Sequence, residues 1–180
     1  MPELYRIVAG AKRHLAAIPE LEQAAATVFP EEDLPPSLRW LVTDRDTLLA
    51  AQEEGRLWVA VDEEGRPVGF ALAEELDGEA FLDEVDVHPQ YSRRGVGTRL
   101  VNTVIGWAES REYTSLSLIT FMHLPWNARF YARFGFEPLE RSEMGPRMRQ
   151  ILLEEARAGI DVSKRVGMRR MLERPEFTEG

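Results

Sequence analysis

Cysteine is absent from the 180-residue sequence. This absence excludes disulfide bonds, thiolate metal ligands and a covalent acyl-cysteine intermediate. Histidine is scarce as well: only His14, His88 and His123 occur, and they do not show the spacing of metal ligands. No G-x-S-x-G sequence is present to carry the serine of a hydrolase. We therefore expect no metal site and no hydrolase of the nucleophile-elbow type.

Long apolar runs are also missing. No stretch approaches the roughly 20 apolar residues that a membrane-spanning helix needs. The first residues, MPELYRIVAG, have neither the basic start nor the apolar stretch of a secretion signal. We expect a cytoplasmic protein that has no membrane partner.

Basic residues are outnumbered by acidic ones, 22 against 31, which gives a formal net charge of −9. An acidic chain repels phosphate groups, so we expect no nucleic acid partner. The charge is compatible with a cationic substrate such as an amine. Acidic soluble proteins are common, however, so solubility alone is the preferred explanation of this charge.

The pattern of apolar residues predicts a mixed α/β fold in a single domain over residues 1–180, because no linker or internal repeat divides the chain. An apolar first strand is expected at 4–8, and the DEEGRP turn at 62–67 predicts a hairpin over 56–76. Further strands are expected at 81–89, 115–121, 136–140 and 165–172. Helices are expected at 15–29 (interrupted by Pro19), 43–55, 96–111, 126–136 and 148–159.

One short stretch, YSRRGVGTRL at 91–100, connects an expected strand to an expected helix. The first amides of a helix have no partner within it, and the helix dipole adds partial positive charge there. Gly95 and Gly97 allow close backbone approach, and Arg93 and Arg94 add charge, so the stretch is either an anion site or an ordinary turn. A dinucleotide-binding turn would need a further glycine where Leu100 stands.

A second stretch, PWNARFYARFGFEPLE at 125–140, follows about thirty residues later. With both stretches, the chain resembles the GNAT superfamily of acyl-CoA-dependent N-acyltransferases. SRRGVGTRL is similar to the family's [QR]-x-x-G-x-[GA] loop, and FYARFGFE to its F-Y-x-x-x-G-F motif. The resemblance implies a twisted mixed sheet of six or seven strands with helices on both faces. It also implies that the central strands 81–89 and 115–121 splay apart to admit the pantetheine arm of a cofactor.

The resemblance implies acetyl-CoA as the cosubstrate. It places the pyrophosphate at the glycine turn and the pantetheine arm along the preceding strand. The implied cofactor-binding residues are Val85, Asp86, Val87, Arg93, Arg94, Gly95, Val96, Gly97, Thr98 and Asn127. Two positions depart from the family pattern: Ser92 stands where Gln or Arg is usual, and Asn127 occupies the place of an alanine, with Leu124 at the usual asparagine position.

Acetyl transfer to an amine requires a base, because a free alkylamine has a pKa near ~10 and must lose a proton before it attacks. The expected base is Glu84, then Asp83, because neighbouring strand residues face opposite sides unless a bulge intervenes. The alternative is that these acids only face solvent. Tyr131 matches the family's general acid, and its alternative is a core tyrosine beside Phe130 and Phe134. Trp40 is the best candidate for a wall on the acceptor side.

The sequence thus predicts an N-acetyltransferase that moves an acetyl group from acetyl-CoA to a primary amine of a small molecule or peptide N-terminus. The transfer would occur by direct attack in a ternary complex, with no metal. A homodimer is possible, since dimers are common in the family. The alternative prediction, motivated by Ser92 and Asn127, is a catalytically inactive CoA-binding sensor or structural homologue.

Overall fold

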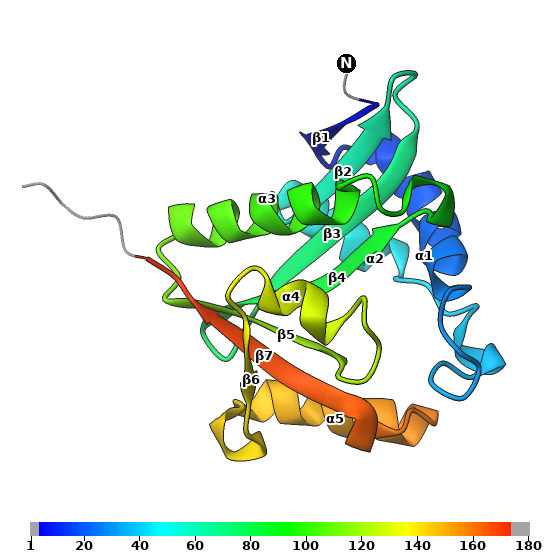
Figure 1. Cartoon of the computed structure of the whole chain (residues 1–180). Helices are drawn as coiled ribbons and strands as arrows, with labels where there is room; N and C mark the ends of the chain where they lie inside the picture. Colours follow the sequence, from blue (N-terminus) through cyan, green and yellow to red (C-terminus); the bar gives the residue numbers. More distant parts are fainter. Residues whose placement is uncertain (1–3, 174–180) are drawn as a thin grey trace, which may run out of the picture.

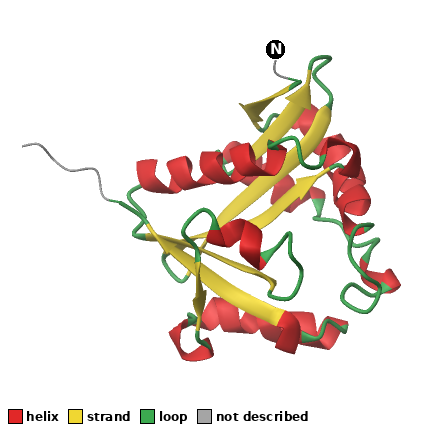
Figure 2. Cartoon of the chain, in the orientation of Figure 1, coloured by secondary structure: helices red, strands yellow, loops and turns green. Residues whose placement is uncertain are grey.

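A seven-stranded mixed sheet with helices on both faces organises the residues that the computed structural model describes, 4–173 (Figures 1 and 2). The strand order is β1-β2-β3-β4-β5-β7-β6. The strands are β1 (Tyr5–Ala9), β2 (Leu57–Asp62), β3 (Pro67–Leu76), β4 (Glu79–Val87), β5 (Ser115–Phe121), β6 (Glu137–Leu139) and β7 (Arg165–Met171). The helices are α1 (Ile18–Ala26), α2 (Arg45–Glu53), α3 (Val96–Ser110), α4 (Ala128–Ala132) and α5 (Pro146–Ala158). Every expected strand and helix is present, and the predicted mixed α/β fold is confirmed.

Helices α1, α2 and α5 cover the face of the sheet opposite to α3 (Figure 1). Alternate residues of a strand point to opposite faces, so the core contacts of each strand identify the covering helix. On β3, Phe70 and Leu72 pack with α1 and α2, whereas Ala71 packs with α3. On β4, Phe81 packs with α5. The sheet therefore has a core on each face.

A bulge in β4 changes which way its side chains point. In the pairing with β3, Leu72 lies opposite Glu84 and the next residue, Ala73, lies opposite Leu82, so Asp83 is an extra residue. Ala80 and Leu82 pack on the α3 side before the bulge, and Val85 and Val87 do so after it. Asp83 and Glu84 consequently face the same side of the sheet, the side of α1.

The central strands β4 and β5 run parallel but pair only at Ala80–Leu116 and Phe81–Ser117. Beyond these two pairs the strands separate. The expected splay is therefore present, and it begins within the two strands. The bulge at Asp83 follows directly after the last pair, and a bulge bends its strand and increases the local twist.

The first expected helix, 15–29, is divided and shortened. A 3₁₀ helix spans Lys12–Ala17 and α1 spans Ile18–Ala26. Pro19 lies in the first turn of α1, where its missing N–H costs no hydrogen bond, so the proline starts the helix rather than interrupting it. Helix α4 is likewise shorter than the expected 126–136, with Gly135 in the left-handed conformation (φ +83°) in the turn that follows it.

Candidate active site

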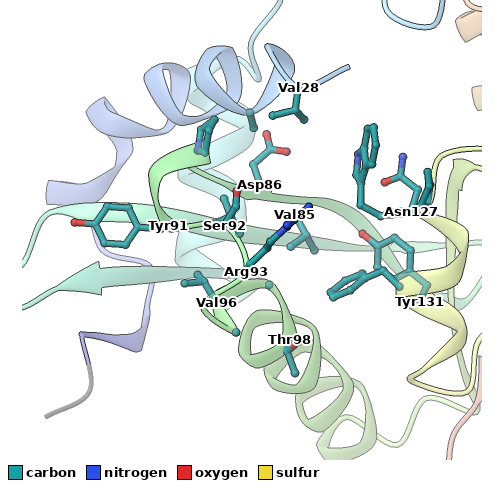
Figure 3. A pocket seen from close by; sticks show the side chains of 18 of the residues that line it. Val28, Val85, Asp86, Tyr91, Ser92, Arg93, Val96, Thr98, Asn127 and Tyr131 are labelled. Carbon is teal, nitrogen blue, oxygen red and sulfur yellow. The ribbon is translucent and has the colours of Figure 1, made fainter. Parts of the chain in front are cut away.

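A cavity of about 1070 Å³ lies between β4, the glycine turn, α4 and the end of α1 (Figure 3). We call it the larger cavity. Figure 3 shows Val85 and Asp86 of β4 on one wall, with Asn127 and Tyr131 on another. The sequence-predicted residues that line it are Val85, Asp86, Val87, Arg93, Gly95, Val96, Gly97, Thr98, Asn127 and Tyr131.

The glycine turn has the backbone shape that an anion site requires. Arg93 (φ +60°) and Gly95 (φ +82°) both adopt the left-handed conformation, and α3 begins directly afterwards at Val96. A Cβ atom at Gly95 would lie 3.2 Å from the Tyr5 hydroxyl, so a side chain there would be both strained and crowded. The first amides of α3 lack partners within the helix, and the residues that carry them, Val96, Gly97 and Thr98, line the larger cavity.

Arg94 is the one predicted cofactor residue that lines neither cavity of this site. Its guanidinium lies over the Tyr91 ring, 5.3 Å from the ring centroid, and its carbonyl oxygen accepts a hydrogen bond from the Tyr5 hydroxyl at 3.1 Å. Two arginines of the second motif, Arg129 and Arg133, line the larger cavity with Arg93. The three guanidiniums give this cavity the positive charge that the phosphates of CoA require.

A second cavity of about 300 Å³, the smaller cavity, opens beside the splayed part of β4. The carboxylates that line it are Glu22, Asp83, Glu84 and Asp86, and its apolar walls include Leu34, Leu38 and Leu41. Trp40, the expected wall residue, is instead 73% exposed and is not among the lining residues. The two cavities share Phe29, Val85, Asp86 and Asn127, so they meet beside β4.

The surroundings of the carboxyl groups of Asp83, Glu84 and Asp86 on β4 disfavour their ionised forms. Asp83 is exposed on the sheet surface, yet desolvation by the surrounding atoms, with a contribution from nearby Glu74, raises its pKa to about 7. Burial also raises the pKa of Glu84 well above its ordinary value, with Asp86 and Glu22 contributing. The pKa of Asp86 is raised by burial to about 6, although its hydrogen bond with Glu84 acts in the opposite direction. A pKa near neutrality suits a group that exchanges protons with a substrate.

Glu22 is a member of this site that the sequence analysis did not identify. It is 7% exposed on α1, and its carboxylate accepts hydrogen bonds from the backbone N–H of Thr43 at 2.9 and 3.1 Å and from the Thr43 hydroxyl at 2.5 Å. The Thr43 hydroxyl also lies 3.4 Å from Glu84 Oε2. The sequence signal that could have identified Glu22 is its position on the apolar face of the helix, four residues after Ile18 and three before Ala25.

Tyr131 lies on α4 with its ring packed edge-on against Phe130 and Phe136, at centroid distances of 5.1 and 5.9 Å. Tyr131 lines the larger cavity and also packs against the core, where Phe130 is the ring that the core interpretation named and Phe136 is the second ring in contact. Burial raises the pKa of its hydroxyl, and the charge of Asp86 adds to this. The hydroxyl consequently keeps its proton at neutral pH and can donate it.

Residues 4–173 contain neither a cluster of metal ligands nor a helix that could span a membrane. No group of three His, Asp or Glu side chains in this part of the chain could hold a metal ion. None of the helices described here is both long and apolar enough to cross a membrane. His123 Nε2 instead lies 2.9 Å from the buried carboxylate of Asp33, as its hydrogen-bond partner.

Comparisons with known proteins agree with this geometry. The model of the acetyltransferase (GNAT) family matches residues 16–136. An uncharacterized N-acetyltransferase of Methanocaldococcus jannaschii is 31% identical over 100 residues, which are 52% of this chain and 43% of that protein. The matched segment thus spans less than half the length of that relative.

Solved structures share the fold. The ribosomal-protein-S18-alanine N-acetyltransferase of Escherichia coli superimposes with a TM-score of 0.65 at 21% identity, covering 96% of this chain and 97% of that one. The PaiA N-acetyltransferase of Thermoplasma acidophilum, solved in complex with coenzyme A, gives a TM-score of 0.64 at 14% identity, covering 93% and 98%. Identities this low establish the fold and leave the acceptor of this chain open.

Proposed function

Because the chain belongs to the GNAT acetyltransferase family, we propose that it transfers an acetyl group from acetyl-CoA to a primary amine. The observation that carries the proposal is the junction of the two cavities beside β4. One cavity leads to the arginines and the glycine turn, and the other is lined by carboxylates. An anionic cosubstrate and a cationic acceptor therefore have separate binding sites that meet at Val85 and Asp86.

The larger cavity provides the binding groups for acetyl-CoA. Arg93, Arg129 and Arg133, with the first amides of α3, would bind its phosphates. Val85 to Val87 line the same cavity where β4 has left its partner β5, so the backbone N–H and C=O groups on the β5 side of this stretch would bind the pantetheine arm. When bound, acetyl-CoA supplies a thioester whose carbonyl carbon accepts the amine.

The smaller cavity provides the base and the larger cavity the acid. Glu84 takes a proton from the acceptor ammonium, so that an N–H bond breaks and an O–H bond forms. The neutral amine forms a C–N bond to the acetyl carbon, and the C–S bond breaks. Tyr131 then gives its phenolic proton to the departing sulfur, and the second proton that the amide nitrogen loses passes to the Tyr131 oxygen, so that the phenol is restored. Holding both substrates at one junction supplies much of the rate enhancement without a covalent enzyme intermediate.

The acceptor that the cavity favours is a small amine or a peptide N-terminus. The cavity of about 300 Å³ accommodates a short side chain, and its wall of Leu34, Leu38 and Leu41 suits an apolar portion beside the ammonium. The alanine acceptor named for the Escherichia coli structure belongs to the peptide class. Four carboxylates lining the cavity favour a positively charged acceptor over an acidic one.

Two measurements on the purified full chain test the proposal. Calorimetry with acetyl-CoA is expected to show one site. Thiol release over a panel of amines and short peptides, with the product identified by mass spectrometry, is expected to show acetylated amine. Binding without turnover of any acceptor would support the alternative, an inactive CoA-binding homologue. The absence of binding would overturn both.

A further inference from the structure

The Thr43 hydroxyl lies between two carboxylates that come from different elements. It is 2.5 Å from Oε1 of Glu22, on α1, and 3.4 Å from Oε2 of Glu84, on β4. The three groups are separated by 21 and 41 positions in the chain, so only the fold brings them together. Glu22 and Glu84 both line the smaller cavity.

A hydroxyl group carries one proton, so Thr43 cannot donate to both carboxylates at once. Glu22 already accepts two hydrogen bonds from the Thr43 backbone N–H, and the hydroxyl contact at 2.5 Å makes it the nearer acceptor. The lone pairs of Thr43 Oγ1 then remain for Glu84. Glu84 can use them only as a donor, when it carries a proton.

We propose that Glu22 and Thr43 form a proton relay that restores Glu84 after each acetyl transfer. This inference rests on the proposed function, because it requires that Glu84 accept a proton from the acceptor amine. Glu84 then gives the proton from its Oε2 to Thr43 Oγ1, while Thr43 gives its own hydroxyl proton to Glu22 Oε1. Two O–H bonds break and two form, and the net change is one proton moved from Glu84 to Glu22. Both residues act through Glu84 and are therefore positioning residues.

The charges around Glu84 hold a proton on it, so the release of that proton requires an acceptor close by, which Glu22 provides through Thr43. Asp83 and Asp86 from β4 and Glu22 from α1 all disfavour a negative charge on Glu84, and burial contributes most. Tyr131 of α4 keeps its proton and adds no charge. Arg165 of β7 lines the same cavity, but its guanidinium forms hydrogen bonds with Glu155 at 2.8 and 2.9 Å. Glu22 in turn faces the cavity, so the proton leaves through it when the product departs.

The two bonds from the Thr43 backbone allow the hydroxyl to be removed alone. In Thr43→Val the N–H bonds to Glu22 and the branched shape of the side chain are retained, and only the relay oxygen is lost. We expect kcat to fall about tenfold with little change in the acceptor KM. Thr43→Ser restores the hydroxyl and is expected to restore kcat. A purely structural role for Thr43 would not produce this pattern.

Glu22→Gln supplies a second, independent readout. It retains an oxygen that accepts from Thr43 but removes the negative charge facing Glu84, so the pKa of Glu84 is expected to fall. The rising limb of kcat/KM should therefore move to lower pH, and kcat should fall because the relay has lost its final acceptor. The carboxyl ¹³C resonance of Glu84, titrated in the wild type and in Glu22→Gln, should show the same direction without any turnover.

The outcomes separate the relay from the proposed function. An active wild type with unchanged kcat in Thr43→Val, or with an unmoved rising limb in Glu22→Gln, overturns the relay and leaves acetyl transfer intact. An inactive wild type overturns the proposed function. If the wild type were inactive and the Glu84 resonance still shifted in Glu22→Gln, the shift would show only electrostatic coupling between Glu22 and Glu84, and the relay would be rejected.

Discussion

The hydroxyl of Tyr5 donates a hydrogen bond to the carbonyl oxygen of Arg94 at 3.1 Å, across 89 positions of the chain. Tyr5 is nine-tenths buried on β1. Its hydroxyl therefore supports the glycine turn, and Tyr5 itself is not among the residues that line the larger cavity. The shape of the anion site thus depends on the first strand, as well as on the motif itself.

Removal of this support should weaken cofactor binding. In Tyr5→Phe the ring remains in the core, but one hydrogen bond to the turn is lost, which costs about 1 kcal/mol. We expect the Kd for CoA to rise about fivefold by calorimetry. Tyr113→Phe is the matched control, because it removes a hydroxyl that donates to Glu75 at 2.6 Å, away from both cavities. Equal affinities of the two variants would show that the turn needs no support from Tyr5.

Gly95 is expected to tolerate no side chain. Its φ of +82° costs an alanine about 1–2 kcal/mol, and the new Cβ would lie 3.2 Å from the Tyr5 hydroxyl. Gly95→Ala should therefore unfold at a lower urea concentration and bind CoA more weakly.

Gly106, within α3, is the control, because we expect a side chain to be tolerated there. A Cβ there would meet no atom within 4 Å, so Gly106→Ala should stabilise α3 by about 0.5–1 kcal/mol and leave CoA binding unchanged. If both variants behaved alike in urea unfolding, the left-handed conformation of Gly95 would not be the reason for its glycine.

The loop that walls the smaller cavity is fixed by a buried ion cluster. Asp33 is 1% exposed and accepts hydrogen bonds from Lys164 Nζ at 3.0 Å and from His123 at 2.9 Å. Burial opposes ionisation of Asp33, but the bonds from His123 and Lys164 outweigh it, so its pKa lies below the ordinary value. The carboxylate thereby links the loop after α1 to the segments that flank β5 and β7.

Asp33→Asn should destabilise the protein by about 2 kcal/mol at neutral pH, because charge-assisted hydrogen bonds are lost. The contribution of Asp33 is complete above the pKa of an unfolded aspartate, near ~4, and disappears as the pH falls through its lower folded pKa. Urea unfolding of wild type and variant should therefore differ equally at pH 7 and 5 and converge below pH 4. A gap that persisted in acid would indicate lost packing instead of lost charge.

The elements could be predicted from the sequence because each carries a local pattern. The hairpin of β2 and β3 follows from apolar runs on either side of a Gly–Pro turn, and α3 from apolar residues spaced three and four apart. The glycine turn was also predictable, since its conformation depends on Gly95 itself.

Features that arise only from tertiary contacts could not be predicted. The bulge that turns Asp83 and Glu84 to one side depends on the pairing of β4 with β3. The sequence of β4 alone does not determine the register of that pairing. The link from Glu22 through Thr43 to Glu84 joins three distant segments. The side chain of Arg94, a predicted cofactor residue, lies over the Tyr91 ring in this structure.

The most direct test of whether Glu84 removes the amine proton at the junction of the two cavities is acetyl transfer by Glu84→Gln. Its kcat/KM is measured as a function of pH, beside the wild type and Asp83→Asn. We expect Glu84→Gln to lower kcat/KM about 10²-fold or more at neutral pH. Its CoA affinity should be unchanged, and activity should recover only at high pH, where the acceptor loses its proton without help. Asp83→Asn should retain a rising limb, moved to lower pH, because the charge of Asp83 also raises the pKa of Glu84. A Glu84→Gln variant with the rate and pH profile of the wild type would contradict the assignment.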